Sequence, residues 1–256
     1  MRALVNGIIV GCLLLILAGS AGAQTKNVAL DDLLGDWLNR DYVEALKKTR
    51  SPLESLKMRY SAMTFTKKAR WYEWMVVVNF HEAGRFNNID GLHHSGTADN
   101  YTLEFNKNQY GRTIPENDRI VYPDGSLDAL AWLSIIDGKE QRIQFVRVKP
   151  TMEAYVNQVV LAGEYTDTTG RKIVFTDNCK AIWPDETFTY VLGLDHVLTK
   201  CDYLYITEPG AKKYLAYAFE WKDSKLLIYN VVRPTEGFEA MYPAREPVYV
   251  LTPAKK

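Results

Sequence analysis

The chain has 256 residues, with 31 basic and 31 acidic side chains and no formal net charge. This balance argues against a nucleic-acid partner, because phosphate binding needs clustered Lys and Arg. Aromatic residues make up 12% of the chain and include 16 tyrosines, which favours a β-rich protein whose tyrosine hydroxyls reach the rim of its core.

The amino-terminal segment has the pattern of a secretory signal peptide, residues 1–23. Arg2 gives the positive start, Ile8 to Leu17 form an apolar run, and Ala21-Gly22-Ala23 supplies the small residues of a cleavage site. The run is too short for a spanning helix, so we expect a secreted or periplasmic chain without a transmembrane anchor. Ile9-Val10-Gly11-Cys12 also resembles a lipoprotein cleavage box, although cleavage there would leave an exposed apolar end.

The mature chain opens on Leu33-Leu34-Gly35-Asp36-Trp37, after a short helical lead-in expected over residues 28–34. A Gly-x-Trp at the start of the first strand is typical of small ligand-holding barrels. There the glycine permits close backbone approach, and the indole closes one end of the barrel. Gly35 and Trp37 are therefore predicted to have structural roles.

Two short helices are expected next, in a helical insert over residues 41–57. Asp41 can cap a helix that runs to Lys48, and Ser51-Pro52-Leu53-Glu54 is a capping box with proline at its first helical position. From residue 58 onward a period of two predicts strands, with a turn at Gly84 and the clearest hairpin at Asp137-Gly138. The strands expected in this half are 59–66, 70–80, 86–92, 101–105, 119–122, 131–136 and 142–148.

A helix is expected over residues 151–160, and it leads into Leu161-Ala162-Gly163-Glu164-Tyr165. This segment repeats the opening pattern: two apolar or small residues, glycine, an acid and an aromatic. The repeat could mark a duplicated half, or two strands that enter one barrel at similar corners. The strands expected in the second half are 164–167, 172–176, 179–183, 187–194, 202–207, 214–221, 226–232 and 248–251, with an irregular proline-rich tail.

On Gly35, Trp37, the export signal and the strand-rich remainder, the chain resembles the calycin group: lipocalins, fatty-acid-binding proteins and bacterial lipocalin-like proteins. The insert at 41–57 is similar to the helical lid of fatty-acid-binding proteins, whereas the second lipocalin motif, Thr-Asp-Tyr, is not found. The resemblance implies an all-β fold with short helices. It predicts one antiparallel up-and-down β-barrel of about eight to twelve strands over residues 24–256, with an internal apolar pocket.

Two sets of residues are predicted to have particular roles. Cys179 and Cys201 form an even pair without C-x-x-C spacing in an exported chain, which predicts a structural disulfide. Aromatic side chains on the strands are predicted to bind the ligand, because alternate strand positions face a barrel interior. The aromatic set consists of Trp71, Trp74, Trp132, Phe145, Tyr190, Tyr217, Phe219 and Trp221.

The leading functional hypothesis is the binding of a small hydrophobic or amphipathic molecule, with no cofactor and no catalytic residue. One alternative is a metal-assisted hydrolase at His81, His93 and His94, which could meet at one end of a hairpin. Adjacent histidines on a strand point to opposite faces, which counts against joint chelation. Another alternative is a surface or assembly protein whose β edge pairs with a second chain. The ligand and the oligomeric state stay open.

Overall fold

The computed structural model describes residues 28–94, 100–105, 118–123, 126–197, 199–207, 215–232 and 241–254. The predicted signal peptide, residues 1–23, lies outside the described residues. None of the helices in these ranges is long and apolar enough to cross a membrane.

Eight antiparallel strands close a first barrel in chain order, because β1 pairs with β8 as well as with β2. The 3-10 helix η1 (Leu30–Leu33) precedes it. Asp137 and Gly138 form the predicted hairpin turn, with φ values of 51° and 76°. The strands are β1 (Gly35–Asn39), β2 (Tyr60–Lys67), β3 (Tyr72–Val78), β4 (Glu82–His94), β5 (Asn100–Phe105), β6 (Arg119–Val121), β7 (Ala129–Ile136) and β8 (Lys139–Val148).

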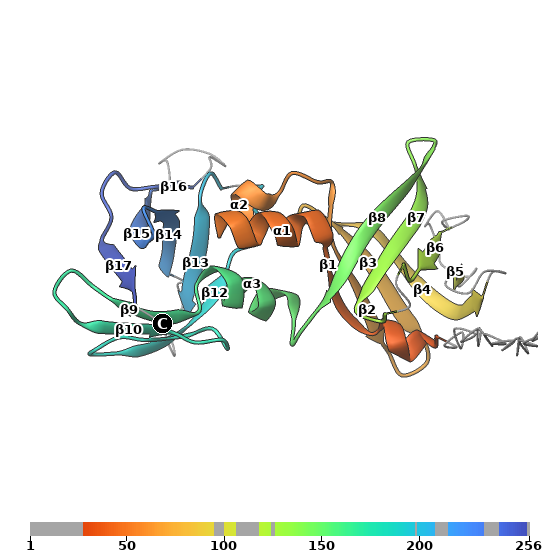
Figure 1. The fold of residues 1–256 in the computed structure, drawn as a ribbon, viewed down its shortest axis with the longest axis horizontal. Coiled ribbons are helices and arrows are strands. Elements are labelled where there is room, and N and C mark those ends of the chain that lie inside the picture. The colour runs from red at the N-terminus through yellow and green to blue at the C-terminus, as the bar shows by residue number, and fades with distance from the viewer. Residues whose placement is uncertain are drawn as a thin grey trace, which may run out of the picture.

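A second closed barrel is built from the strands after residue 160, and the two barrels lie side by side in Figure 1. Its last strand, β17, lies between β9 and β15, and a β14–β15 pairing completes the closure. The short β16 adds to β15. The strands are β9 (Gly163–Thr166), β10 (Lys172–Phe175), β11 (Lys180–Ile182), β12 (Thr187–Leu192), β13 (Asp202–Thr207), β14 (Leu215–Lys222), β15 (Lys225–Val232), β16 (Tyr242–Pro243) and β17 (Tyr249–Pro253).

The antiparallel all-β barrel class is confirmed, but the expectation of one barrel over residues 24–256 is wrong. The helix expected over 151–160 separates two sets of strands, and each set satisfies its own edges by closing on itself. The repeated segments at Gly35 and Gly163 therefore begin the first strand of each barrel. The predicted turn at Gly84 is also wrong, because Gly84 lies inside β4.

The repeated segments share a local hydrogen bond. Trp37 Nε1 donates to the carbonyl of Leu33 at 2.9 Å, and Tyr165 Oη donates to the carbonyl of Leu161 at 2.6 Å, in both cases four residues back. Each aromatic ring thus holds the end of the helical turn that leads into its strand. In the first barrel the Arg147 guanidinium lies 4.4 Å from the centroid of the Trp37 ring, within cation–π range.

Glycine is favoured at position 35 by the backbone conformation there and not by the close approach of a neighbouring atom. Its φ of 112° is a conformation that side chains disfavour, whereas a Cβ added there would meet nothing within 4 Å. The expectation that Gly35 permits close backbone approach is therefore wrong, and its role is to adopt a positive φ. Trp37 itself is fully buried in the core of the first barrel.

Three helices complete the fold: α1 (Arg40–Thr49), α2 (Pro52–Ser55) and α3 (Met152–Val160). The insert predicted over 41–57 is confirmed as α1 and α2. Asn39, not Asp41, caps α1 by accepting the Asp41 N–H at 2.9 Å. Half of the predicted capping box is present in α2: Ser51 Oγ accepts the Glu54 N–H at 3.0 Å, whereas the Ser51 N–H donates to Thr49 Oγ1 and not to the Glu54 side chain.

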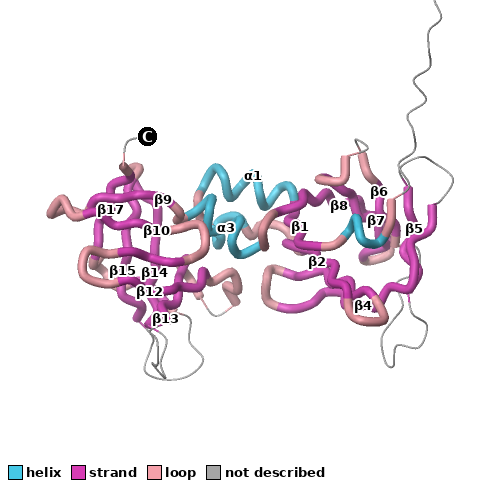
Figure 2. The backbone as a smooth tube through the Cα atoms, turned by 90° about the horizontal axis from the view of Figure 1, so that it is seen from below, coloured by secondary structure: helices cyan, strands magenta, loops and turns pink. Residues whose placement is uncertain are grey.

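α1 and α3 lie between the two barrels (Figures 1 and 2). On α1, Tyr42, Val43 and Leu46 are buried in one apolar cluster that also contains interior residues of the second barrel, such as Phe219 and Leu226. A helix that leaves the first barrel therefore packs into the core of the second.

We expect Leu46→Ala to lower the free energy of unfolding by about 2–5 kcal/mol, because Leu46 is fully buried and its removal leaves a cavity in this shared core. Denaturant unfolding measures the loss. Lys47→Ala, at an exposed position of the same helix, is the control and should change the free energy by less than about 0.5 kcal/mol. Equal effects of the two substitutions would contradict the shared core.

Candidate functional site

The predicted ligand-binding residues of the first barrel lie in its packed core or outside it. Trp74, Trp132 and Phe145 are fully buried. The rings of Trp74 and Trp132 meet edge to face with centroids 5.7 Å apart, and Tyr60 packs on Trp132 at 5.2 Å. Trp71 is 40% exposed on the segment that joins β2 to β3. Aromatic side chains thus pack against one another inside the first barrel.

In the second barrel, interior residues alternate along β14. Trp221 lies toward α3, where its Nε1 donates to the carbonyl of Val160 at 3.0 Å. Phe219 is buried, and so is Tyr190 on β12. Tyr217, at the other end of this row, lines an apolar hollow. Of the eight aromatic residues in the predicted set, Tyr217 is the one that lines this hollow.

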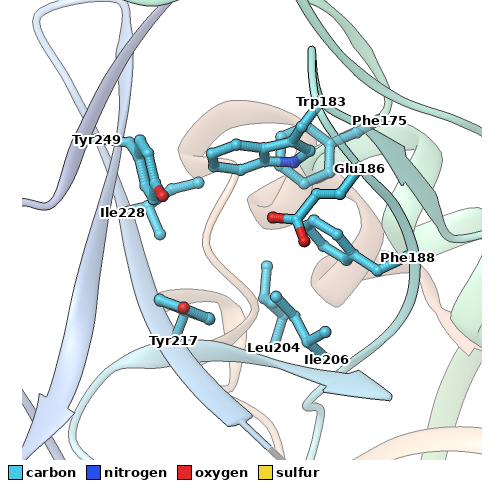
Figure 3. Close-up of a pocket in the computed structure, with 9 residues that line it drawn as sticks. All are labelled: Phe175, Trp183, Glu186, Phe188, Leu204, Ile206, Tyr217, Ile228 and Tyr249. Carbon is cyan, nitrogen blue, oxygen red and sulfur yellow. The ribbon is translucent and has the colours of Figure 1, made fainter. Parts of the chain in front are cut away.

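The hollow lies at one end of the second barrel, and Figure 3 shows the nine side chains around it. It holds about 340 Å³ of empty space when its open mouth is included, around a cavity of about 30 Å³. The cavity alone is therefore no larger than about one or two water molecules. The lining residues are Phe175, Trp183, Glu186, Phe188, Leu204, Ile206, Tyr217, Ile228 and Tyr249.

A tight turn between β11 and β12 positions two of these side chains. The Trp183 N–H donates to the carbonyl of Glu186 at 2.8 Å, and Pro184 lies between them. Trp183 then packs edge to face on Tyr249, with ring centroids 4.3 Å apart, and lies 5.8 Å from the Phe188 ring. The turn therefore presents an indole and a carboxylate at the mouth of an apolar barrel.

One polar atom of this turn, the indole nitrogen of Trp183, is not used by the fold. The Trp183 Nε1–H is buried and meets no hydrogen-bond acceptor in the part of the chain that the structure describes. A buried donor without an acceptor costs about 1–3 kcal/mol. The hollow is thus apolar in most of its lining and has a hydrogen-bond donor that a bound molecule could satisfy.

Sequence reasoning missed most of the residues that line the hollow, although a signal was present. In β12, buried and exposed residues alternate strictly, with Phe188, Tyr190 and Leu192 directed inward. This alternation identifies interior residues. It does not distinguish Tyr190, whose hydroxyl donates to Asn157 on α3, from Phe188 at the open end.

A second and larger cleft, with a cavity of about 350 Å³ against about 30 Å³ for the hollow, lies in the first barrel where β1 ends and α1 begins. Arg40 Nη1 donates there to Gln144 Oε1 at 2.7 Å, and Arg59 pairs with Asp137 at 3.2 Å across an exposed surface. This polar lining does not match a partly hydrophobic ligand. Its residues are Asn39, Asp41, Met58, Arg59, Tyr60, Gln141, Arg142, Ile143 and Gln144.

The structure does not bring the three predicted histidines together. His81 Nδ1 lies 2.8 Å from Asp195 Oδ2, whereas His93 Nε2 lies 2.6 Å from Glu104 Oε2. His81 precedes β4, and His93 and His94 end it, so the expectation that they meet at one end of a hairpin is wrong. Among the described residues, no three His, Cys, Asp or Glu side chains are grouped to hold a metal ion.

The predicted disulfide between Cys179 and Cys201 is also wrong, because both thiols are free in the structure. Cys179 packs against the core of the second barrel. Cys201 belongs to a separate small cluster with Ala218 and Tyr229. The two side chains thus lie in different apolar clusters.

A buried polar cluster ties α2 to the second barrel. Asp202 Oδ1, at the start of β13, accepts the N–H of Leu53 at 2.7 Å. His196 Nε2 lies 3.8 Å from the same oxygen, and His196 Nδ1 is 3.0 Å from Thr199 Oγ1. Asp202, His196 and Thr199 are all buried. Because these side chains are inaccessible to solvent, we interpret the cluster as a structural contact between α2 and the second barrel.

Burial shifts the two titratable groups in opposite directions. It raises the pKa of Asp202 to about 6, despite hydrogen bonds from Ser51 and Leu53 that lower it. It lowers the pKa of His196 to about 4, against the smaller raising effects of a backbone hydrogen bond and Asp195. Between these values, the proton resides on the carboxyl group in the folded protein and on the imidazole in the unfolded chain.

Comparison of the chain with protein-family models, with curated proteins and with solved structures gives no match.

We expect Asp202→Asn and His196→Gln to give the folding stability opposite pH dependences. The raised pKa of Asp202 favours folding below about pH 4, and this contribution is lost as the pH rises through 6. The lowered pKa of His196 favours folding above about pH 6.5, and this contribution is lost as the pH falls through 4. The pH dependences of these two contributions nearly cancel in the unchanged protein.

The measurement is the unfolding free energy at several pH values between 4 and 7. Relative to the unchanged protein, Asp202→Asn should gain about 3 kcal/mol as the pH rises across this range, and His196→Gln should lose about as much. Slopes of the same sign, or no slope in either variant, would show that these two groups do not titrate as described.

Proposed function

We propose that the protein is an exported, lipocalin-like protein that binds a small, partly hydrophobic molecule in the hollow of its second barrel. The observation that carries the proposal is the aromatic mouth of this barrel, where Trp183, Phe188 and Tyr249 surround an open apolar space. A concave, mostly apolar site with a few polar groups is the usual form of a small-molecule site.

The two ends of the second barrel support this location. One end is covered by α1 and α3, with Arg50 stacked 4.1 Å from the centroid of the Trp221 ring. The opposite end holds the hollow and the Trp183 Nε1–H, which has no acceptor among the described residues. A ligand with an apolar body and one hydrogen-bond acceptor would cover the apolar lining and satisfy this donor.

The proposed export rests on the leader pattern in residues 1–23. Native mass spectrometry of the protein from its own host tests export and ligand binding in one experiment. We expect a chain that begins at Gln24 and carries a small molecule that dissociates on activation. A chain that retains its leader would contradict export, and a chain free of any retained molecule would count against ligand binding.

The position of the site is tested by substituting two tryptophans. We expect Trp183→Ala to weaken the binding of 1-hexanol, a neutral probe, by about tenfold, because one wall of the hollow is lost and about 1.4 kcal/mol corresponds to this factor. Titration followed by nuclear magnetic resonance measures the affinity. Trp71→Ala is the matched control, since Trp71 is exposed on the first barrel, and it should leave the affinity within about twofold.

Trp183→Phe keeps an aromatic wall while it removes the indole N–H, and it guards against a folding defect in Trp183→Ala. Intermediate binding by Trp183→Phe would agree with the proposal. Binding of hexanol that is unchanged in both Trp183 variants, or lost in Trp71→Ala, would place the site elsewhere.

A further inference from the structure

The hollow has a single charged lining residue. Among the nine residues around it, Glu186 is the one that carries a charge, and the rest are aromatic or aliphatic. Figure 3 shows the Glu186 carboxylate directed into the space between Trp183, Phe188 and Leu204. The electrostatic character of the site is therefore that of one negative charge at the exposed edge of an apolar hollow.

This carboxylate has no partner within the described residues. Among these residues, the Glu186 side chain forms no ion pair or hydrogen bond. The Arg171 guanidinium, whose pKa is raised mainly by Asp167 and to a smaller extent by Asp185 and Tyr249, is already paired: its Nε lies 2.8 Å from Asp167 Oδ2. The backbone carbonyl of Glu186 is fixed by the turn. The carboxylate is thus kept at the mouth by the fold and is available to a bound cation.

The rings around Glu186 suit a cation as well. Trp183 and Tyr249 lie nearly perpendicular, at 78°, and Trp183 and Phe188 are tilted at 42°. Rings in different planes present several faces to one volume, and the faces of aromatic rings attract cations. Weakly hydrated alkylammonium groups are the cations that such an arrangement recognises best, because little water has to be removed from them.

We propose that the ligand of the second barrel is an organic amine, with an alkylammonium group beside the Glu186 carboxylate and an apolar body among the aromatic side chains. This inference rests on the proposed function and specifies its ligand class. The ammonium group lies at the mouth, where Glu186 is exposed, and the apolar part extends toward Leu204 and Ile228.

The test compares three probes of equal chain length on the full chain: hexyltrimethylammonium, 1-hexanol and hexanoate. Isothermal titration or nuclear magnetic resonance gives the three affinities. We expect the ammonium probe to bind at least about tenfold more tightly than hexanol, and hexanoate to bind more weakly than hexanol because of Glu186.

Glu186→Gln keeps the shape of the side chain and removes its charge, so the preference for the ammonium probe should fall about tenfold while hexanol binding is unchanged. Asp185→Asn is the matched control, because Asp185 is an exposed neighbour outside the lining, and it should preserve the preference.

The outcomes separate the two proposals. Equal binding of hexanol and the ammonium probe, or a preference that persists in Glu186→Gln, overturns the amine inference and leaves the binding of apolar molecules standing. Failure of all three probes to bind overturns the proposed function, and the amine inference with it.

Discussion

The structure depends on how the open ends of a barrel are sealed. Closing eight strands into a cylinder removes the sheet edges, but it leaves two ends through which water could reach an apolar interior. The first barrel fills its interior with large aromatic side chains such as Trp74 and Trp132. The second barrel is instead covered at one end by α1, a helix that follows the first strand of the first barrel at Asn39. Tyr42 and Leu46 of this helix pack into the core of the second barrel. The two barrels are therefore not interchangeable modules.

The joint between the barrels combines apolar burial with a few polar contacts that determine its geometry. Burial of α1 supplies most of the stabilisation, since apolar area removed from water is the largest favourable contribution. The contact of Asp202 with the Leu53 N–H fixes where α2 lies on β13. An ionised carboxylate would be costly in this core, and burial keeps both Asp202 and His196 uncharged in the folded protein between about pH 4 and pH 6.

Local signals in the sequence were reliable, while signals that depend on the closure of a sheet were not. Asp137-Gly138 and Ser51–Glu54 identified a hairpin and a helix start because these residues interact with their immediate neighbours. The turn before β4 was misplaced because Asn79 and Phe80 adopt φ values of 48° and 57° there without any glycine. A phenylalanine in this conformation gives no warning in the sequence.

The candidate site shows the same limit. Alternation along a strand tells which side chains point inward, but depth along the barrel depends on the stagger of all eight strands. The sequence therefore predicted the same ligand-binding role for Tyr217 and Trp221, although Tyr217 lines the hollow and Trp221 packs against α3. The cysteines were misjudged for a related reason, since an even number of thiols does not place two of them on the same side of a sheet. Glu186 was not predicted as a site residue because it lies in a short polar turn between two strands.

The position of β17 gives the molecule a direction of assembly. The first barrel has all of its strands once the chain has been made as far as Val148, whereas the second stays an open sheet until β17 pairs between β9 and β15. Domains generally fold as their residues become available, from the amino-terminal side. Tyr249 lies on this last strand, so the wall of the hollow is complete only when β17 is in place. A nascent chain can therefore hold a finished first barrel and still have no cavity to fill.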